Sequence, residues 1–269
     1  MFRQKGKYPV KNEPILYEKL NKIGRITFNR PDNLNSMNHE INFAFQKIID
    51  HVKTDRELRC IVITGSGSTF CGGADFKSGF EKNSGPRLNE VLMDFYSPFL
   101  DIGNLKIPVI GAINGHAIGG GLGIALMCDI RVANSRTTLG ATFTRLGLHS
   151  GMAVSYILPR LVGLAKANEL LFTGRMITGE EAALMGLVNY AVDKNKVMEK
   201  AMALADEIAL SAPAAVQMMK HSIYRGLDWD PVTAAEIESL YQARTFEMED
   251  AKEGIAAMFE KRKPNFQGK

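Results

Sequence analysis

Cysteine is scarce in this sequence, which has only Cys60, Cys71 and Cys128 among 269 residues. An odd number of widely spaced cysteines, with no Cys-x-x-Cys pair, fits neither a disulfide framework nor a structural zinc site. We therefore expect no metal site. We also expect a reducing compartment, and the cytoplasm is the default location of such a chain.

The sequence also lacks an excess of charge of one sign. Its 33 basic and 29 acidic residues leave a net charge of +4, which gives no reason to expect nucleic acid as a partner. The 45% of hydrophobic and 23% of charged residues are typical of a soluble globular protein. The basic stretch 3–11 has no apolar segment of the kind a secretory signal requires, so we expect a frayed end there.

Charged residues are missing altogether from 107–128, a stretch long enough to span a bilayer. The same stretch contains six glycines together with Pro108, Asn114 and His116. So many interruptions argue against a membrane helix and favour a buried strand, a glycine turn and a buried helix. We expect no membrane association.

Apolar runs predict strands that alternate with helices along the first 200 residues. The predicted strands cover 15–19, 23–29, 60–64, 109–114 and 130–133. Helices are predicted from Asn38 onward and at about 88–103, 121–127 and 151–172. The residues expected to face the core from the first helix are Ile41, Phe45, Ile48 and Val52. This alternation is typical of a layered α/β core.

The pattern becomes purely helical toward the end of the chain. Thr178 and Glu181 have the spacing of a capping box, and from Lys194 the helical pattern continues almost to the last residue. We predict an α/β core over 13–200 and a helical oligomerisation region over 201–269. The apolar side chains that need a partner surface there are Ile208, Val216, Met219, Ile223, Ile237, Leu240 and Met258.

Two glycine-rich segments each follow a predicted buried strand, at 70–77 and 116–123. The second does not match the dinucleotide fingerprint, because Leu126 occupies the place of its third glycine, and no P-loop is present. One backbone N–H from each segment can together stabilise a carbonyl oxygen as it becomes negative. Alternatively, both segments are tight turns that pack strand against helix.

In their order along the chain, these motifs resemble the crotonase family, the enoyl-CoA hydratase/isomerase superfamily. The resemblance runs from about Glu13 to Phe266. Its landmarks are 29–35, 61–65, 70–77, 108–121, 128–129, 158–163, 173–174, 181–182, 186–188 and 259–263. It implies an α/β fold, a crotonase-like spiral of ββα units with a C-terminal all-α trimerisation region.

The resemblance also implies acyl-CoA thioesters as substrates, as in fatty acid metabolism, and two backbone N–H groups that stabilise a thioester enolate. By position these groups belong to Ala74 and Gly120. The residues that would hold the adenine and pantetheine part of CoA are Leu34, Ala74, Asp75, Phe76 and Lys77. Lys261 aligns with a residue that reaches the CoA of a neighbouring subunit, or else is a solvated lysine. No separate cofactor is implied, and the expected assembly is a homotrimer or a dimer of trimers.

The sequence departs from the family pattern at the two glutamates that hold the attacking water in typical hydratases. These glutamates would fall at Gly123 and Phe143, which we still expect to line the acyl site although neither transfers a proton. The aspartate of the dehalogenase-like branch would fall at Gly151, and that of the naphthoate-synthase branch at Ser150. None of these branches fits residue for residue.

Few titratable side chains remain near the expected site. His149 is a candidate general acid or base, because imidazole titrates near pH 7, or else a packed or solvent-facing loop residue. Ser150 is a natural N-cap for the helix expected from Gly151. Asp129 and Arg131 are expected to form a buried ion pair or a cap.

Two functions follow. The first is an acyl-CoA enzyme with non-standard proton transfer: an unusual hydratase or isomerase, a decarboxylase, or a thioester or β-diketone hydrolase. The alternative is a CoA-binding or moonlighting protein with little catalytic activity. Gly123 and Phe143 together weakly favour apolar or aromatic acyl chains.

Overall fold

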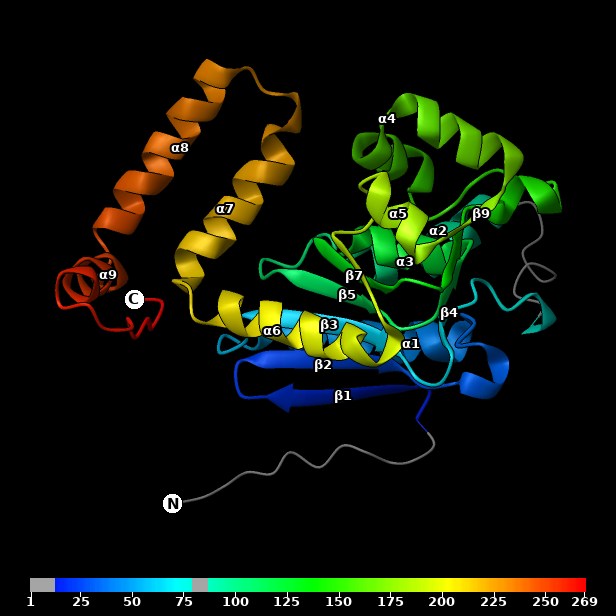
Figure 1. Ribbon diagram of the computed structural model, residues 1–269, viewed down its shortest axis with the longest axis horizontal. Helices are drawn as coiled ribbons and strands as arrows, with labels where there is room; N and C mark the ends of the chain where they lie inside the picture. Colours follow the sequence, from blue (N-terminus) through cyan, green and yellow to red (C-terminus); the bar gives the residue numbers. More distant parts are fainter. Residues whose placement is uncertain (1–12, 79–86) are drawn as a thin grey trace.

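The computed structural model of the chain describes residues 13–78 and 87–269 (Figure 1). The basic stretch 3–11 lies outside the described residues. Within the described part, no helix combines the length and the apolar character needed to cross a membrane.

Two β-sheets form the centre of the molecule (Figure 1). The larger sheet has the order β1-β2-β3-β5-β7-β10, with β1 antiparallel to β2 and the other neighbours parallel. The smaller sheet has the order β4-β6-β8-β9. The strands are β1 Ile15–Leu20, β2 Ile23–Phe28, β3 Cys60–Gly65, β4 Thr69–Cys71, β5 Val109–Ile113, β6 His116–Ile118, β7 Ile130–Asn134, β8 Thr138–Gly140, β9 Met176–Thr178 and β10 Tyr190–Val192. All five predicted strands are confirmed within a residue or two, whereas the three-residue strands are too short to leave a periodic pattern.

The chain repeats one unit three times: a strand in the larger sheet, a strand in the smaller sheet, then a helix. The units are β3–β4–α2, β5–β6–α3 and β7–β8–α4, with α2 spanning Leu88–Leu100, α3 Gly120–Met127 and α4 Val154–Thr173. The predicted spiral of ββα units is therefore confirmed. Its consequence for the site is that β4 and β6 are neighbours, so the segments that follow them lie close together.

The first helix, α1, spans His39–Thr54 and is capped as predicted, since the Asn38 side chain accepts a hydrogen bond from Ile41 N. Its fully buried residues are Ile41, Phe45, Ile49 and Val52. Ile48, expected on this face, packs against the core but is only partly buried, and the prediction missed Ile49. The four buried residues are separated by four, four and three positions, which keeps Ile49 on the buried face of the helix. Ile48 packs only at the margin of the core.

The start of α4 also differs from expectation, because the helix begins at Val154 rather than near Gly151. Met152 and Ala153 have φ values of +57° and +55°, which a helix cannot accommodate. The residue at the N-cap is Ala153, so the predicted capping role of Ser150 is not realised. By contrast, the predicted Thr178–Glu181 capping box is present at the start of α5, Gly179–Leu184.

The open face of the larger sheet is covered by α6, Val197–Ala209 (Figure 1). Val197, Ala201 and Ala205 pack there against β-strand residues such as Val62 and Ile110. The boundary predicted at residue 200 falls inside this helix. In the folded chain α6 belongs with the sheet, and the helices that extend away from it begin with α7.

The last three helices are α7 Pro213–Arg225, α8 Pro231–Phe246 and α9 Glu249–Phe259, and α7 and α8 project away from the sheets (Figure 1). Lys220 anchors α7 to the core: its Nζ donates to Asp129 Oδ2 at 2.8 Å and to Ile107 O at 3.0 Å. Tyr224 Oη donates to Asp129 Oδ1 at 2.6 Å. The expected ion pair between Asp129 and Arg131 is therefore replaced by the pair between Asp129 and Lys220. Arg131 donates to backbone carbonyls instead.

We expect this protein to be a trimer or a dimer of trimers in solution. Met219, Ile223, Leu240 and Met258 are each 56–65% exposed on the projecting helices, an apolar surface that favours burial against another subunit. Light scattering at micromolar concentration checks this expectation. A monomeric mass under those conditions would contradict it.

Candidate functional site

The first turn of α3 presents backbone N–H groups at the edge of the smaller sheet. Gly119 adopts φ +55° and ψ −118°, a conformation open essentially to glycine, and its N–H donates to Gly140 O at 2.8 Å. Gly123 N donates to Gly119 O at 3.1 Å, and it is the first N–H of α3 with an acceptor in this turn. Gly120 therefore has an N–H without an intrahelical acceptor, at the positive end of the helix dipole.

The segment after β4 runs beside Met37 as a short parallel bridge. Met37 N donates to Gly73 O and Asp75 N donates to Met37 O, each at 2.8 Å. Because successive groups in extended chain point to opposite sides, the N–H of Ala74 faces away from Met37. Within the described part of the chain, it donates no hydrogen bond.

These two segments meet at Gly73 and Gly120. Gly73 has φ +94°, and a Cβ there would lie 2.8 Å from Ile118 O and 3.5 Å from Gly120 N. A Cβ on Gly120 would in turn lie 3.9 Å from the Cα of Gly73. The sequence-predicted pair, Ala74 and Gly120, thus belongs to two backbone segments in direct contact.

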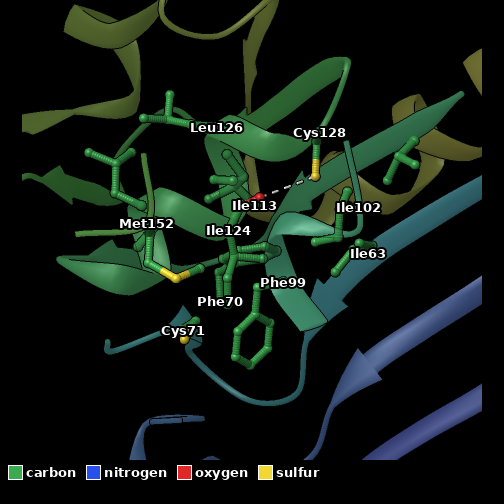
Figure 2. Close-up of a cluster of buried hydrophobic side chains, with 14 of the residues drawn as sticks. Ile63, Phe70, Cys71, Phe99, Ile102, Ile113, Ile124, Leu126, Cys128 and Met152 are labelled. Atoms are coloured by element: carbon green, nitrogen blue, oxygen red, sulfur yellow. Dashed lines mark hydrogen bonds between the residues drawn. The ribbon is translucent and has the colours of Figure 1, made fainter. Parts of the chain in front are cut away.

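The position expected for the first hydratase glutamate is covered by Met152. A Cβ on Gly123 would lie 2.4 Å from Met152 Cβ and 3.2 Å from Met152 Cγ. Met152 is 1% exposed and points into the buried cluster that includes Phe70 and Ile124 (Figure 2). The left-handed backbone of Met152 places its side chain in this position. No side chain at position 123 fits here unless Met152 moves.

The position of the second glutamate and another neighbour of Gly120 are also apolar. Phe143, at the position of the second glutamate, lies in the short helix Thr142–Leu146 and packs, partly buried, against the core. Met37 is 1% exposed, and its Cε lies 2.4 Å from the Cβ position of Gly120. The thioether side chains of Met37 and Met152 therefore lie beside the start of α3, which lowers the local dielectric.

The residues predicted to hold CoA lie around one loop. Gly72 N donates to Leu34 O at 2.9 Å, which joins the Leu34 turn to the segment carrying Ala74. Leu34 and Phe76 are 56% and 48% exposed, beside Lys77 in the turn Phe76–Ser78. The Asp75 carboxylate lies 3.6 Å from the Arg30 guanidinium. Five predicted binding residues (Leu34, Ala74, Asp75, Phe76 and Lys77) are therefore brought together.

Two other predicted residues stand apart. His149 is exposed, and its Nδ1 lies 2.8 Å from Ser150 O, which leaves Nε2 as the acceptor of a neutral ring. Lys261 follows α9, at the opposite end of the long axis from α4 (Figure 1). The roles predicted for His149 and Lys261 both stay predictions.

Comparison with known proteins identifies the family. The model of the enoyl-CoA hydratase/isomerase family matches residues 18–269. The chain belongs to this family. The crotonase resemblance predicted from the motifs is therefore confirmed.

Individual members of the enoyl-CoA hydratase/isomerase family are similar over nearly the full chain. The short-chain-enoyl-CoA hydratase of Clostridium acetobutylicum is 36% identical over 93% of this chain and 95% of its own. The mitochondrial methylglutaconyl-CoA hydratase of Rattus norvegicus is 36% identical over 89% of this chain and 78% of its own. A crystal structure of an enoyl-CoA hydratase from Bacillus anthracis superposes with a TM-score of 0.91 at 32% identity, covering 95% of this chain and 100% of that one.

Sequence reasoning about this family member missed three side chains that shape the site: Met37, Met152 and Tyr96. Tyr96 Oη lies 2.5 Å from the Cβ position of Gly151, and burial raises the pKa of its phenol. Met37 and Tyr96 come from other segments, and Met152 depends on a left-handed backbone. No periodic or motif signal marks such contacts in the sequence.

Proposed function

We propose that this protein is an acyl-CoA enzyme that stabilises a thioester enolate between the N–H groups of Ala74 and Gly120, with proton transfer that uses no glutamate pair. The observation that carries the proposal is the contact between Gly73 and Gly120. Two N–H groups from adjoining segments suit a single carbonyl oxygen. Membership of the enoyl-CoA hydratase/isomerase family supports an acyl-CoA substrate.

In this mechanism the thioester carbonyl oxygen accepts hydrogen bonds from Ala74 and Gly120, and the N-terminus of α3 adds its positive dipole end. As the enolate forms, negative charge moves onto that oxygen, where donors already oriented stabilise it without reorganisation. The apolar surroundings strengthen this stabilisation, because an interaction between charges grows as the local dielectric falls.

The same surroundings limit the reaction. Gly123 lies under Met152 and Phe143 is an apolar ring, so neither position holds or deprotonates water. This favours reactions in which the substrate supplies the proton or the leaving group, such as isomerisation or decarboxylation. In decarboxylation the bond to the carboxylate carbon breaks, CO2 leaves, and its electron pair becomes the enolate.

For CoA itself, we propose binding by Leu34 and the 74–77 segment, with Lys261 contributed by a neighbouring subunit of the trimer. The exposed apolar side chains of Leu34 and Phe76 suit the adenine and pantetheine groups, and Lys77 suits a phosphate. We propose a cytoplasmic location, in keeping with three cysteines that are all buried and unpaired.

The second candidate is a CoA-binding protein with little catalysis. It is favoured by the absence of a proton-transferring side chain at positions 123 and 143. A panel of enoyl-, β-ketoacyl- and malonyl-type CoA thioesters separates the two functions: turnover of any member supports the enzyme, whereas binding of CoA without turnover supports the alternative.

The donor role of Gly120 can be tested with the pair Gly120→Pro and Gly120→Ala. Both variants place a Cβ against Met37 Cε, the mobile end of a flexible side chain, but only proline removes the N–H. We expect Gly120→Pro to bind acetoacetyl-CoA, which ionises to an enolate, about 100-fold more weakly than Gly120→Ala. Free CoA should bind both variants equally in calorimetry. Equal losses for the two ligands would mean that the N–H is not a donor to the enolate.

A further inference from the structure

Asn35 is a fully buried amide that joins two loops next to the candidate site. It is 0% exposed, and its Nδ2 donates to Thr69 O at 2.7 Å and to Ser66 O at 3.0 Å. Its Oδ1 accepts a hydrogen bond from Arg30 N at 2.8 Å. Both carbonyl oxygens lie at the turn between β3 and β4. The Asn35 side chain therefore fastens the loop 30–37 to this turn.

The loop 30–37 in turn holds the segment 72–75 in place. The two backbones exchange three hydrogen bonds of 2.8–2.9 Å, and the two made by Met37 lie on either side of Ala74. The pairing of β4 with β6 ends at Cys71, before this segment begins. The direction of the Ala74 N–H therefore depends on where the loop 30–37 lies.

The Asn35 amide is hard to replace at this position. Its backbone has φ +52°, a left-handed conformation that asparagine tolerates better than most residues with a side chain. A Cβ on Gly65 would lie 2.8 Å from Asn35 Nδ2, so the glycine leaves the space that the amide fills. Loss of the amide removes a buried partner from three backbone groups at once, and buried groups left without a partner are costly. The loop is then free to shift, and a displacement of about 1 Å at a reacting centre can cost about 100-fold.

We propose that Asn35 is a positioning residue for enolate stabilisation: its amide fixes the loop 30–37, and this loop aims the N–H of Ala74. The inference rests on the proposed function, because it requires the Ala74 N–H to donate to the enolate oxygen. Since Asn35 is buried, it acts through the backbone of Met37 and not by touching the ligand.

The test measures the ionisation of acetoacetyl-CoA bound to the full-length protein, followed by the absorbance of its enolate as the pH is raised. An N–H pair that stabilises the enolate lowers the pH at which the bound ligand ionises. Asn35→Gly suits the left-handed backbone but lacks the amide. We expect this pH to rise by about two units in Asn35→Gly, which corresponds to the 100-fold cost of a displaced donor.

Two features keep this measurement specific to the N–H donors. The ligand is present at saturation, so weaker binding of CoA through Leu34 does not contribute. The charged side chains beside the segment, Arg30 and Asp75, lie 3.6 Å apart and are the same in every variant. A change in the ionisation of the bound ligand therefore reports on the position of the donors.

The matched control is Asn42→Ala, which removes an amide whose Nδ2 donates to Phe95 O at 2.7 Å between α1 and α2. We expect Asn42→Ala to lower the melting temperature, as Asn35→Gly does, while the bound ligand ionises at the wild-type pH. An equal rise of this pH in both variants would overturn the inference, because the readout would then follow stability and not the loop that holds Ala74.

A milder variant keeps the test decisive if Asn35→Gly does not fold. Asn35→Ser has a single O–H, which can donate to only one of the two carbonyl oxygens, so we expect a smaller rise in the same direction. Wild-type ionisation in folded Asn35→Gly, or in Asn35→Ser where only that variant folds, would overturn the role of Asn35 alone. Failure of both variants to fold would also overturn it, because the amide would then serve the fold. If acetoacetyl-CoA ionises no more readily on the wild type than in solution, the proposed function fails as well.

Discussion

Crotonyl-CoA should be hydrated by this protein several orders of magnitude more slowly than by a hydratase with two glutamates. General acid and base groups contribute about 10²–10⁴-fold each, and the two positions carry Gly123 and Phe143. Water cannot occupy the first position, because Met152 already fills the space beside Gly123. The measurement is the loss of enoyl absorbance with crotonyl-CoA as substrate.

Rebuilding the glutamate pair requires more than two substitutions. In Gly123→Glu with Phe143→Glu, the new Cβ at position 123 meets the Met152 Cβ, and two carboxylates enter an apolar site, so we expect a destabilised fold without hydration. Adding Met152→Gly removes the clash and suits the left-handed backbone at this residue. We expect this triple variant to gain hydration, whereas Met152→Gly alone should not.

Rapid hydration by the natural protein would contradict this account and would require another proton carrier. His149 is then the first residue to replace, since its Nε2 is available as a proton acceptor. An unchanged rate in His149→Ala would exclude this histidine.

Gly121→Ala should lower the free energy of unfolding more than the same substitution at a nearby exposed glycine. A Cβ on Gly121 would lie 2.0 Å from Cys71 O and 2.7 Å from Cys71 C, backbone atoms of β4 that cannot move aside as a flexible side chain does. We expect a loss of at least about 3 kcal/mol in the free energy of unfolding, at the upper end of the range for overpacking. Thermal melting followed by circular dichroism measures the effect.

The matched control for this prediction is Gly147→Ala. Gly147 has φ +71° and open space around it, so alanine there costs only the left-handed backbone strain of about 1–2 kcal/mol. Similar melting temperatures for the two variants would mean that α3 can move away from β4. The same contact keeps the Gly120 N–H near the Ala74 segment, so we also expect Gly121→Ala to lose acetoacetyl-CoA binding.

Local patterns in the sequence were sufficient to predict much of the fold. The continuous apolar run at 60–64 is buried on both faces of the larger sheet, as its composition indicates. Asn38 and the Thr178–Glu181 pair cap helices because their side chains satisfy N–H groups only three residues away. Each of these features depends on neighbours in the chain, which the sequence displays directly.

The order of the motifs along the chain was sufficient to predict the family, and with it the fold. Glycine is informative here because it marks the places where backbone segments touch. The contacts of Gly73 with Ile118 O and of Gly121 with Cys71 O leave no space for a side chain.

Only the tertiary structure decided what surrounds these motifs. Asp129 pairs with Lys220, 91 residues away, rather than with the nearby Arg131, because the folded chain brings α7 close enough for Lys220 to reach both Asp129 and Ile107 O. Met152 covers Gly123 because two left-handed residues turn the chain before α4, and Tyr96 meets Gly151 because α2 packs beside that turn. Such contacts depend on where whole helices come to rest, which is determined by the packing of the entire core and not by any local run of residues.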